Sequence, residues 1–306
     1  MPLNPMKTRL LPGIIVLFTL ATGLLAGPRG AQWQKVEEAQ KNGLPKSAIE
    51  ALEPIIAGAL ADHAYPEAIK ALGRKIALEG NIQGNKPEEQ VVRMNAALAA
   101  APAEMKPVLE AILARWYWHY FQQNRWRLMQ RTQTATAPGE DFQTWDLARI
   151  LAEIDRHFTA ALAGEQILKA TPVSTYDELL PAGNVPDSYR PTLYDFLAHE
   201  ALEFYQTGEQ GAVKAEDAFE LDANSPIFAD AVEFIRWQPE TTNADSPVLK
   251  SVRLYQKLLD FHHNDADKSA FHDVDLARLV YGHDNAVGGN EDDRFKVALE
   301  RFIAAT

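Results

Sequence analysis

Side chains that could bind a divalent metal are concentrated in residues 260–275. The candidate ligands are His262, His263, Asp265, His272 and Asp275. Imidazoles and carboxylates at this density could serve a metal-dependent hydrolase. A calcium loop counted from Asp265 would, however, need glycine at Ala270 and an acid at Leu276. Because Asp is also a common helix cap, we predict a solvated loop with caps for helices starting near Phe271 and Leu276, and no metal site.

A second polar group lies on one face of a predicted helix. Asp195, His199 and Glu203 are spaced four residues apart, with Glu200 beside them. The zinc-protease motif needs histidine at both ends of its five residues, whereas His199-Glu200 leads to Glu203. We therefore predict a polar helix face with a His–carboxylate contact inside the helix. No spacing among the 42 Asp and Glu residues selects a catalytic pair, and residues 288–289 lack the strand–helix context of a phosphate loop, so we predict no catalytic residue and no cofactor.

The third unusual feature is an aromatic run at residues 116–121, followed by Asn124, Arg125 and Trp126. Such a run could be a stacking platform for sugar or nucleic acid. Consecutive aromatic residues on a helix point in all directions, however, which is expected of a helix buried on several sides. We therefore favour core packing over ligand binding, and the sequence identifies no binding residues.

The elements that must position these residues are predicted to be helices. From Trp33 onward, apolar residues recur at three- and four-residue intervals, and alternating β-branched residues are scarce. Short breaks separate the stripes, as in TPR-like arrays, but no 34-residue consensus repeats. We predict an all-α fold, an irregular TPR-like helical solenoid. Pro54 and Pro107 fall inside apolar stripes, so the helices there should kink or begin later.

Two loop-like stretches divide the chain. Residues 130–142 are Thr-rich with a Pro-Gly turn, and residues 171–191 carry four prolines. We predict an N-terminal helical solenoid over residues 33–170 and a C-terminal helical subdomain over residues 188–304. In the second region the predicted helices are 193–205, 227–237, 248–262, 271–281 and 292–304.

The N-terminus resembles an export signal. Lys7 and Arg9 precede an apolar stretch at residues 10–26, which is the pattern of a Sec-type signal peptide. A retained anchor is less favoured, because this stretch is short for a bilayer span and contains Pro12 and Gly13. We predict a signal peptide over residues 1–26 and export to the periplasm or cell envelope, with membrane contact only if the signal is uncleaved.

Composition excludes several classes of function. The chain has 306 residues, 46% hydrophobic and 24% charged, with a net charge of −12. These values describe a soluble globular protein, and the acidic balance argues against nucleic-acid binding. The absence of cysteine excludes disulfides, thiolate metal sites and cysteine nucleophiles, and it fits an oxidising compartment.

Six stretches carry a family resemblance: residues 43–55, 124–132, 144–155, 188–205, 215–221 and 273–282. In order and spacing they resemble the N-terminal region of large bacterial α2-macroglobulin-like proteins, over residues 33–302. The resemblance implies a helical leader that precedes β-sandwich macroglobulin domains in a protein that traps or inhibits proteases. Many family members add a thioester formed from a cysteine, which this chain lacks. We therefore expect the macroglobulin domains to follow on a longer chain or to be encoded separately.

These observations favour a non-enzymatic, exported scaffold of an α2-macroglobulin-like protease inhibitor. Its expected partners are the downstream macroglobulin domains or an envelope protein, with proteases as further partners, and no nucleic acid. One alternative is a free-standing periplasmic TPR-like adaptor. The other is a metal-dependent hydrolase that uses the five candidate ligands.

Overall fold

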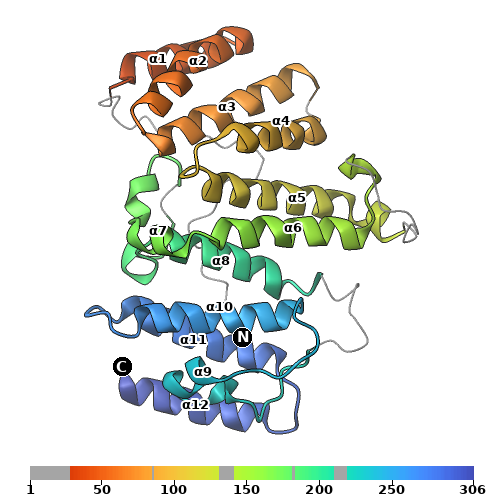
Figure 1. The fold of residues 1–306 in the computed structure, drawn as a ribbon, viewed down its shortest axis with the longest axis vertical. Coiled ribbons are helices and arrows are strands. Elements are labelled where there is room, and N and C mark those ends of the chain that lie inside the picture. The colour runs from red at the N-terminus through yellow and green to blue at the C-terminus, as the bar shows by residue number, and fades with distance from the viewer. Residues whose placement is uncertain (1–27, 85, 131–140, 181–182, 210–218) are drawn as a thin grey trace. The chain divides into compact units, whose positions relative to one another are not determined.

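The computed structural model describes residues 28–84, 86–130, 141–180, 183–209 and 219–306 (Figure 1). These residues form twelve α-helices and several short 3₁₀ turns. Within the described ranges there is no strand, and Asp222 and Val287 form an isolated β-bridge. The all-α prediction is confirmed. The predicted signal peptide lies outside the described residues.

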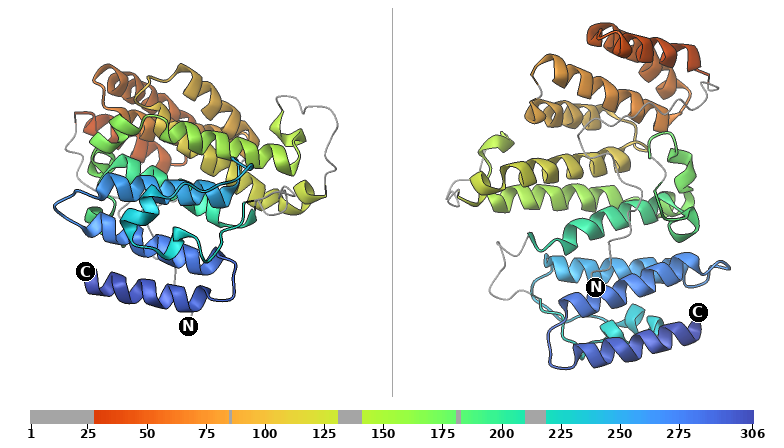
Figure 2. Two further views of the ribbon diagram at one scale, coloured as in Figure 1. Left: turned by 60° about the horizontal axis from the view of Figure 1, so that its bottom comes forward. Right: turned by 180° about the vertical axis from the view of Figure 1, so that it is seen from behind.

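The chain forms two compact units that meet in sequence between Val185 and Pro186, inside the proline-rich stretch. Unit 1 contains the helices α1 (Gly30–Lys41), α2 (Pro45–Ala61), α3 (Tyr65–Ile82), α4 (Pro87–Ala100), α5 (Lys106–Met129), α6 (Leu147–Leu162) and α7 (Glu165–Ala170), with the 3₁₀ turns η1 (Phe142–Thr144) and η2 (Val173–Tyr176). From α1 to α6 each helix packs against its neighbours along the chain, and Figures 1 and 2 show the helices of this unit stacked in successive pairs. Such nearest-neighbour packing is typical of helical solenoids.

Proline marks the start of several helices. It lies in the first turn of α2, α3, α4 and α5, where the missing N–H costs no hydrogen bond. Pro107 therefore begins α5 rather than interrupting it, whereas α2 continues through Pro54.

The interior of unit 1 confirms most of the aromatic prediction. In α5, Tyr117, Trp118, Tyr120 and Phe121 are at most 4% exposed. Trp126 is different, because 79% of it is exposed. These four residues of the run are thus core, and beyond Phe121 one further residue of α5, Leu128, is buried.

Unit 2 contains η3 (Asp187–Tyr189), α8 (Leu193–Gln206), η5 (Pro226–Phe228), α9 (Ala231–Arg236), α10 (Pro247–His262), α11 (Ser269–Asn285) and α12 (Glu291–Ala305). Eleven of the 14 residues of α8 are buried. It packs on α10, which also contacts α9 and α11, and α12 packs on α11.

Two details of the predicted helices in unit 2 are wrong. The helix expected over residues 227–237 is a 3₁₀ turn followed by the short helix α9, because the Asp230 side chain accepts a bond from the Glu233 N–H and starts a new helix there. The second helix start expected near Leu276 does not exist, since α11 runs unbroken from Ser269. None of the helices in the described ranges is long and apolar enough to cross a membrane.

Candidate functional site

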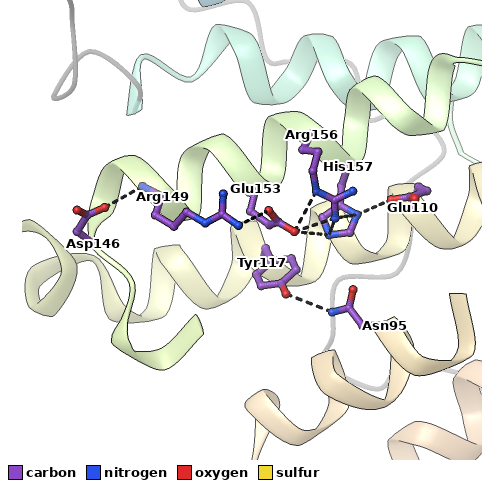
Figure 3. A network of polar contacts seen from close by, with 8 residues as sticks. All are labelled: Asn95, Glu110, Tyr117, Asp146, Arg149, Glu153, Arg156 and His157. Atoms are coloured by element: carbon purple, nitrogen blue, oxygen red, sulfur yellow. Dashed lines mark hydrogen bonds and ion pairs between the residues drawn. The ribbon is translucent and has the colours of Figure 1, made fainter. Parts of the chain in front are cut away.

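A polar network in unit 1 joins α5 to α6 around a fully buried histidine (Figure 3). His157 Nδ1 is hydrogen-bonded to the Glu110 carboxylate, and an Arg156 nitrogen lies 3.0 Å from His157 Nε2. Glu153 Oε1 also lies 3.5 Å from His157 Nε2. Both ring nitrogens are therefore engaged within the protein.

Glu153 stays ionised in this network. Its Oε1 lies 2.7 Å from an Arg156 nitrogen, and its Oε2 lies 3.4 Å from Arg149. Burial alone would raise the pKa of Glu153, but the hydrogen bond and charge of Arg156, with further contributions from His157 and Arg149, lower it below the usual value. A carboxylate held ionised in this way is a poor general acid.

An open cleft of about 970 Å³ lies beside the network, between α4, α5, η1 and α6. It is lined by Glu88, Glu89, Val92, Arg93, Asn95, Tyr117, Asp141, Phe142, Gln143, Trp145, Arg149 and Glu153. We call it the α4–α6 cleft.

The floor of the α4–α6 cleft is aromatic and rigidly packed. The Tyr117 ring stacks on Trp145 at 5.9 Å and on His157 at 5.4 Å, and Phe142 meets Tyr117 edge-on at 5.3 Å. Asn95 donates a 3.2 Å hydrogen bond to the Tyr117 hydroxyl, whose pKa is raised by burial. These rings fix the shape of the floor and present no reactive atom.

The rim of the same cleft is charged. The Arg149 guanidinium lies 4.6 Å from the centre of the Trp145 ring, and Arg93 is held by Glu79 and by Gln83. Val92 stands between the charged groups with 61% of its surface exposed. An aromatic floor with an apolar residue and both signs of charge on the rim suits contact with another protein.

In unit 2 the structure brings together residues from the two polar groups noted in the sequence. His262, at the end of α10, has Nε2 2.7 Å from Asp195 Oδ1 on α8 and Nδ1 2.7 Å from Asp265 Oδ2. The other Asp195 oxygen accepts bonds from the backbone N–H and hydroxyl of Thr192. Burial would lower the pKa of His262, but its bonds to Asp195 and Asp265 outweigh burial and raise it. His262 is thus an imidazolium with both nitrogens donating, and it offers no lone pair to a metal.

The other predicted metal ligands lie apart from the contact between Asp195 and His262. His263 is exposed, the His272 ring packs edge-on against Phe302, and Asp275 forms an ion pair with Arg278. Asp267 accepts a bond from the Ser269 N–H at the start of α11. In the part of the chain that the structure describes, no three His, Asp or Glu side chains are grouped to hold a metal ion. The prediction of a solvated loop is wrong for His262, which is 1% exposed.

The prediction of a His–carboxylate contact inside α8 is also wrong. His199 Nδ1 bonds the backbone carbonyl of Asp195 at 2.8 Å, and the Asp195 carboxylate turns to Thr192 and His262 instead. Asp195 and Glu200 are buried, whereas Glu203 is exposed. The Thr192-x-x-Asp195 spacing is a capping box, which was a usable sequence signal for the buried position of Asp195.

Sequence inspection missed the interior role of Arg278. It is 1% exposed, its Nε lies 2.7 Å from Asp275 Oδ1, and it also donates to the carbonyls of Ile227 and Ala229. It therefore holds α11 against the segment that carries η5 and α9. A lone arginine in an amphipathic pattern gives no signal for this role.

Comparison of the chain with protein-family models, with curated proteins and with solved structures found no match. The evidence for the sites described above is therefore the geometry of this chain alone.

Proposed function

We propose that this protein is a non-enzymatic, protein-binding scaffold and that a partner docks in the α4–α6 cleft of unit 1. The observation that carries the proposal is the cleft itself, with its aromatic floor, its exposed Val92 and its charged rim. Aromatic residues and arginine are enriched where protein partners bind tightly, and apolar contact at the centre with charge at the rim is the usual arrangement.

The engagement of the ionisable groups favours contact over catalysis. Glu153 is committed to Arg156 and Arg149, and both nitrogens of His157 have partners. A general base or nucleophile needs a lone pair that can reach a substrate. Side chains that already neutralise one another instead give a surface of fixed shape and charge.

The partner that we propose is a β-sandwich macroglobulin domain, as the resemblance to α2-macroglobulin-like proteins implies. Loops cluster at the ends of a β-sandwich, and a loop with one apolar side chain between charged ones would match the aromatic floor and charged rim of the cleft. In this proposal the chain acts in protease defence through that partner.

A photo-crosslinking experiment tests the partner. A crosslinking amino acid is placed at Val92 in the cleft, and separately at Ile167, which is 66% exposed on α7 and does not line the cleft. In cells that make the protein, the Val92 position should capture a polypeptide with macroglobulin domains, the Ile167 position should not, and a second change, Arg149→Glu, should reduce capture at Val92. Equal capture at both positions, or no capture at Val92, would contradict docking in the cleft, and capture of an unrelated protein would favour the adaptor.

Export is part of the proposal and has its own test. The basic and apolar pattern of residues 1–26 is that of a signal peptide. N-terminal sequencing of the protein from the cell envelope fraction should give a chain that starts after Ala26 or Ala31. A protein that retains residue 1 and stays in the cytoplasmic fraction would contradict export.

A further inference from the structure

In unit 2, one buried polar atom lies close to two others. They are Nε of Arg190 at the end of η3, Nε2 of His199 on α8 and Oδ2 of Asp273 on α11. Asp273 Oδ2 lies 3.8 Å from Arg190 Nε and 3.9 Å from His199 Nε2. The side chains of Arg190, His199 and Asp273 are 17, 11 and 9% exposed.

These distances are too long for direct hydrogen bonds, and the three atoms have no hydrogen-bonding partner among the described residues. Buried polar atoms in native proteins are almost always paired, with protein or with an ordered solvent molecule. A single atom can lie at about 2.8 Å, a normal hydrogen-bond length, from two atoms that are 3.8 or 3.9 Å apart. Each of these two spacings therefore fits a small molecule that bridges Asp273 to Arg190 or to His199.

The hydrogen-bonding roles of the three atoms define what that molecule must be. His199 Nδ1 faces a backbone carbonyl, which only accepts, so Nδ1 carries the hydrogen. Burial and the nearby Arg190 charge lower the pKa of His199 to about 3, so the ring is neutral and Nε2 accepts. Burial raises the pKa of Asp273 and the charge of Arg190 opposes that rise. With the Arg190 guanidinium 3.8 Å from Oδ2, we take Oδ2 as a carboxylate oxygen, which accepts. Arg190 Nε–H can only donate.

We infer that Arg190, His199 and Asp273 form a binding site for a single internal water molecule, which links η3, α8 and α11. The site needs a ligand that donates two hydrogen bonds and accepts one, and water has two donors and two acceptor lone pairs. Chloride donates none, and a metal ion or ammonium accepts none and is repelled by the guanidinium. An alcohol supplies one hydroxyl hydrogen where two are required.

A crystal structure of the whole protein at high resolution tests the site without any substitution. The expected result is one solvent peak within hydrogen-bonding distance of Arg190 Nε, His199 Nε2 and Asp273 Oδ2. The inference is overturned if Arg190 Nε and Asp273 Oδ2 bond each other directly, with no density between the three side chains.

A measurement in solution tests the same site independently. Oxygen-17 relaxation dispersion of water counts long-lived internal waters in the intact protein. His199→Phe removes one acceptor, so the dispersion amplitude should fall by that of one water, whereas His263→Phe, a matched change at an exposed histidine, should leave it unchanged. An unchanged amplitude in a folded His199→Phe protein would overturn the inference.

Discussion

The two carboxylates that hold His262 should differ greatly in what they contribute to stability. Asp195 and Asp265 each lie 2.7 Å from one nitrogen of the same ring. The side chain of Asp195 is 1% exposed, however, and that of Asp265 is 42% exposed. The equal distances alone would predict equal contributions to stability, whereas the difference in burial predicts unequal ones.

Asp195→Ala should lower the free energy of unfolding by about 3–5 kcal/mol, because it leaves a buried imidazolium without its partner. It also removes the acceptor that caps the Thr192 N–H at the start of α8. Asp265→Ala should cost no more than about 1 kcal/mol, because an exposed ion pair is well screened by water. Both variants are compared with wild type by urea unfolding at pH 6, with hydrogen exchange of α8 and α10 to assign the loss to unit 2.

The pH dependence provides a second check on this reasoning. Since the folded pKa of His262 is raised above its unfolded value of about 6.5, the pair stabilises fully below that pH and loses its effect as pH rises through the folded pKa. The difference between Asp195→Ala and wild type should therefore shrink at alkaline pH. Equal losses for the two variants at pH 6, or a difference that grows with pH, would refute the argument from burial.

Four further predictions concern other positions. Gly282→Ala should destabilise the protein by about 1–3 kcal/mol, because a new Cβ would lie 2.6 Å from a side-chain carbon of Ile227. Gly73→Ala, in an open position inside α3, should instead stabilise it by about 0.5–1 kcal/mol. The pKa of His199 is about 3 in the folded protein and about 6.5 in the unfolded chain, so the unfolded chain binds the proton more readily. The free energy of unfolding should therefore fall as pH drops below about 6.5, by about 2 kcal/mol at pH 5, and His199→Gln should remove this pH dependence. Arg278→Met should cost about 3–5 kcal/mol, because it leaves buried Asp275 without its cation.

Urea unfolding monitored by circular dichroism measures all of these changes. A neutral Gly282→Ala protein would show that α11 does not approach η5 closely. A wild-type slope that persists in His199→Gln would mean that another group titrates. A loss below about 1 kcal/mol in Arg278→Met would show that water reaches Asp275.

Three helices of unit 2 could be predicted from the spacing of their apolar residues. The predicted helices at 193–205, 248–262 and 292–304 correspond to α8, α10 and α12 within one or two residues at each end. The three- and four-residue spacing of apolar residues marks each of these helices, although α8 is buried over most of its surface and Ala298 is the one buried residue of α12. The prediction failed between residues 227 and 237, where the apolar residues span two short elements and a capping aspartate decides the boundary.

The polar sites could be predicted only in part, because their partners are distant in sequence. The Thr192–Asp195 capping box is local and has a recognisable spacing. Asp195 and His262, in contrast, are 67 residues apart, and Arg278 reaches carbonyls 49 and 51 residues away. Spacing rules describe neighbours within one helix, so they cannot indicate which polar residues of different helices will meet.

The buried histidines show why residue type alone is weak evidence for chemistry. His157 and His262 have the composition of a metal or catalytic site around them, yet each has both ring nitrogens bonded within the protein. His199 keeps one nitrogen without such a bond among the described residues, and that nitrogen faces Arg190 and Asp273 in the interior of unit 2. Catalysis by a histidine requires a lone pair that a substrate can reach, and the lone pair of His199 is buried. The α4–α6 cleft of unit 1 is open, and this is the surface at which we propose that a partner binds.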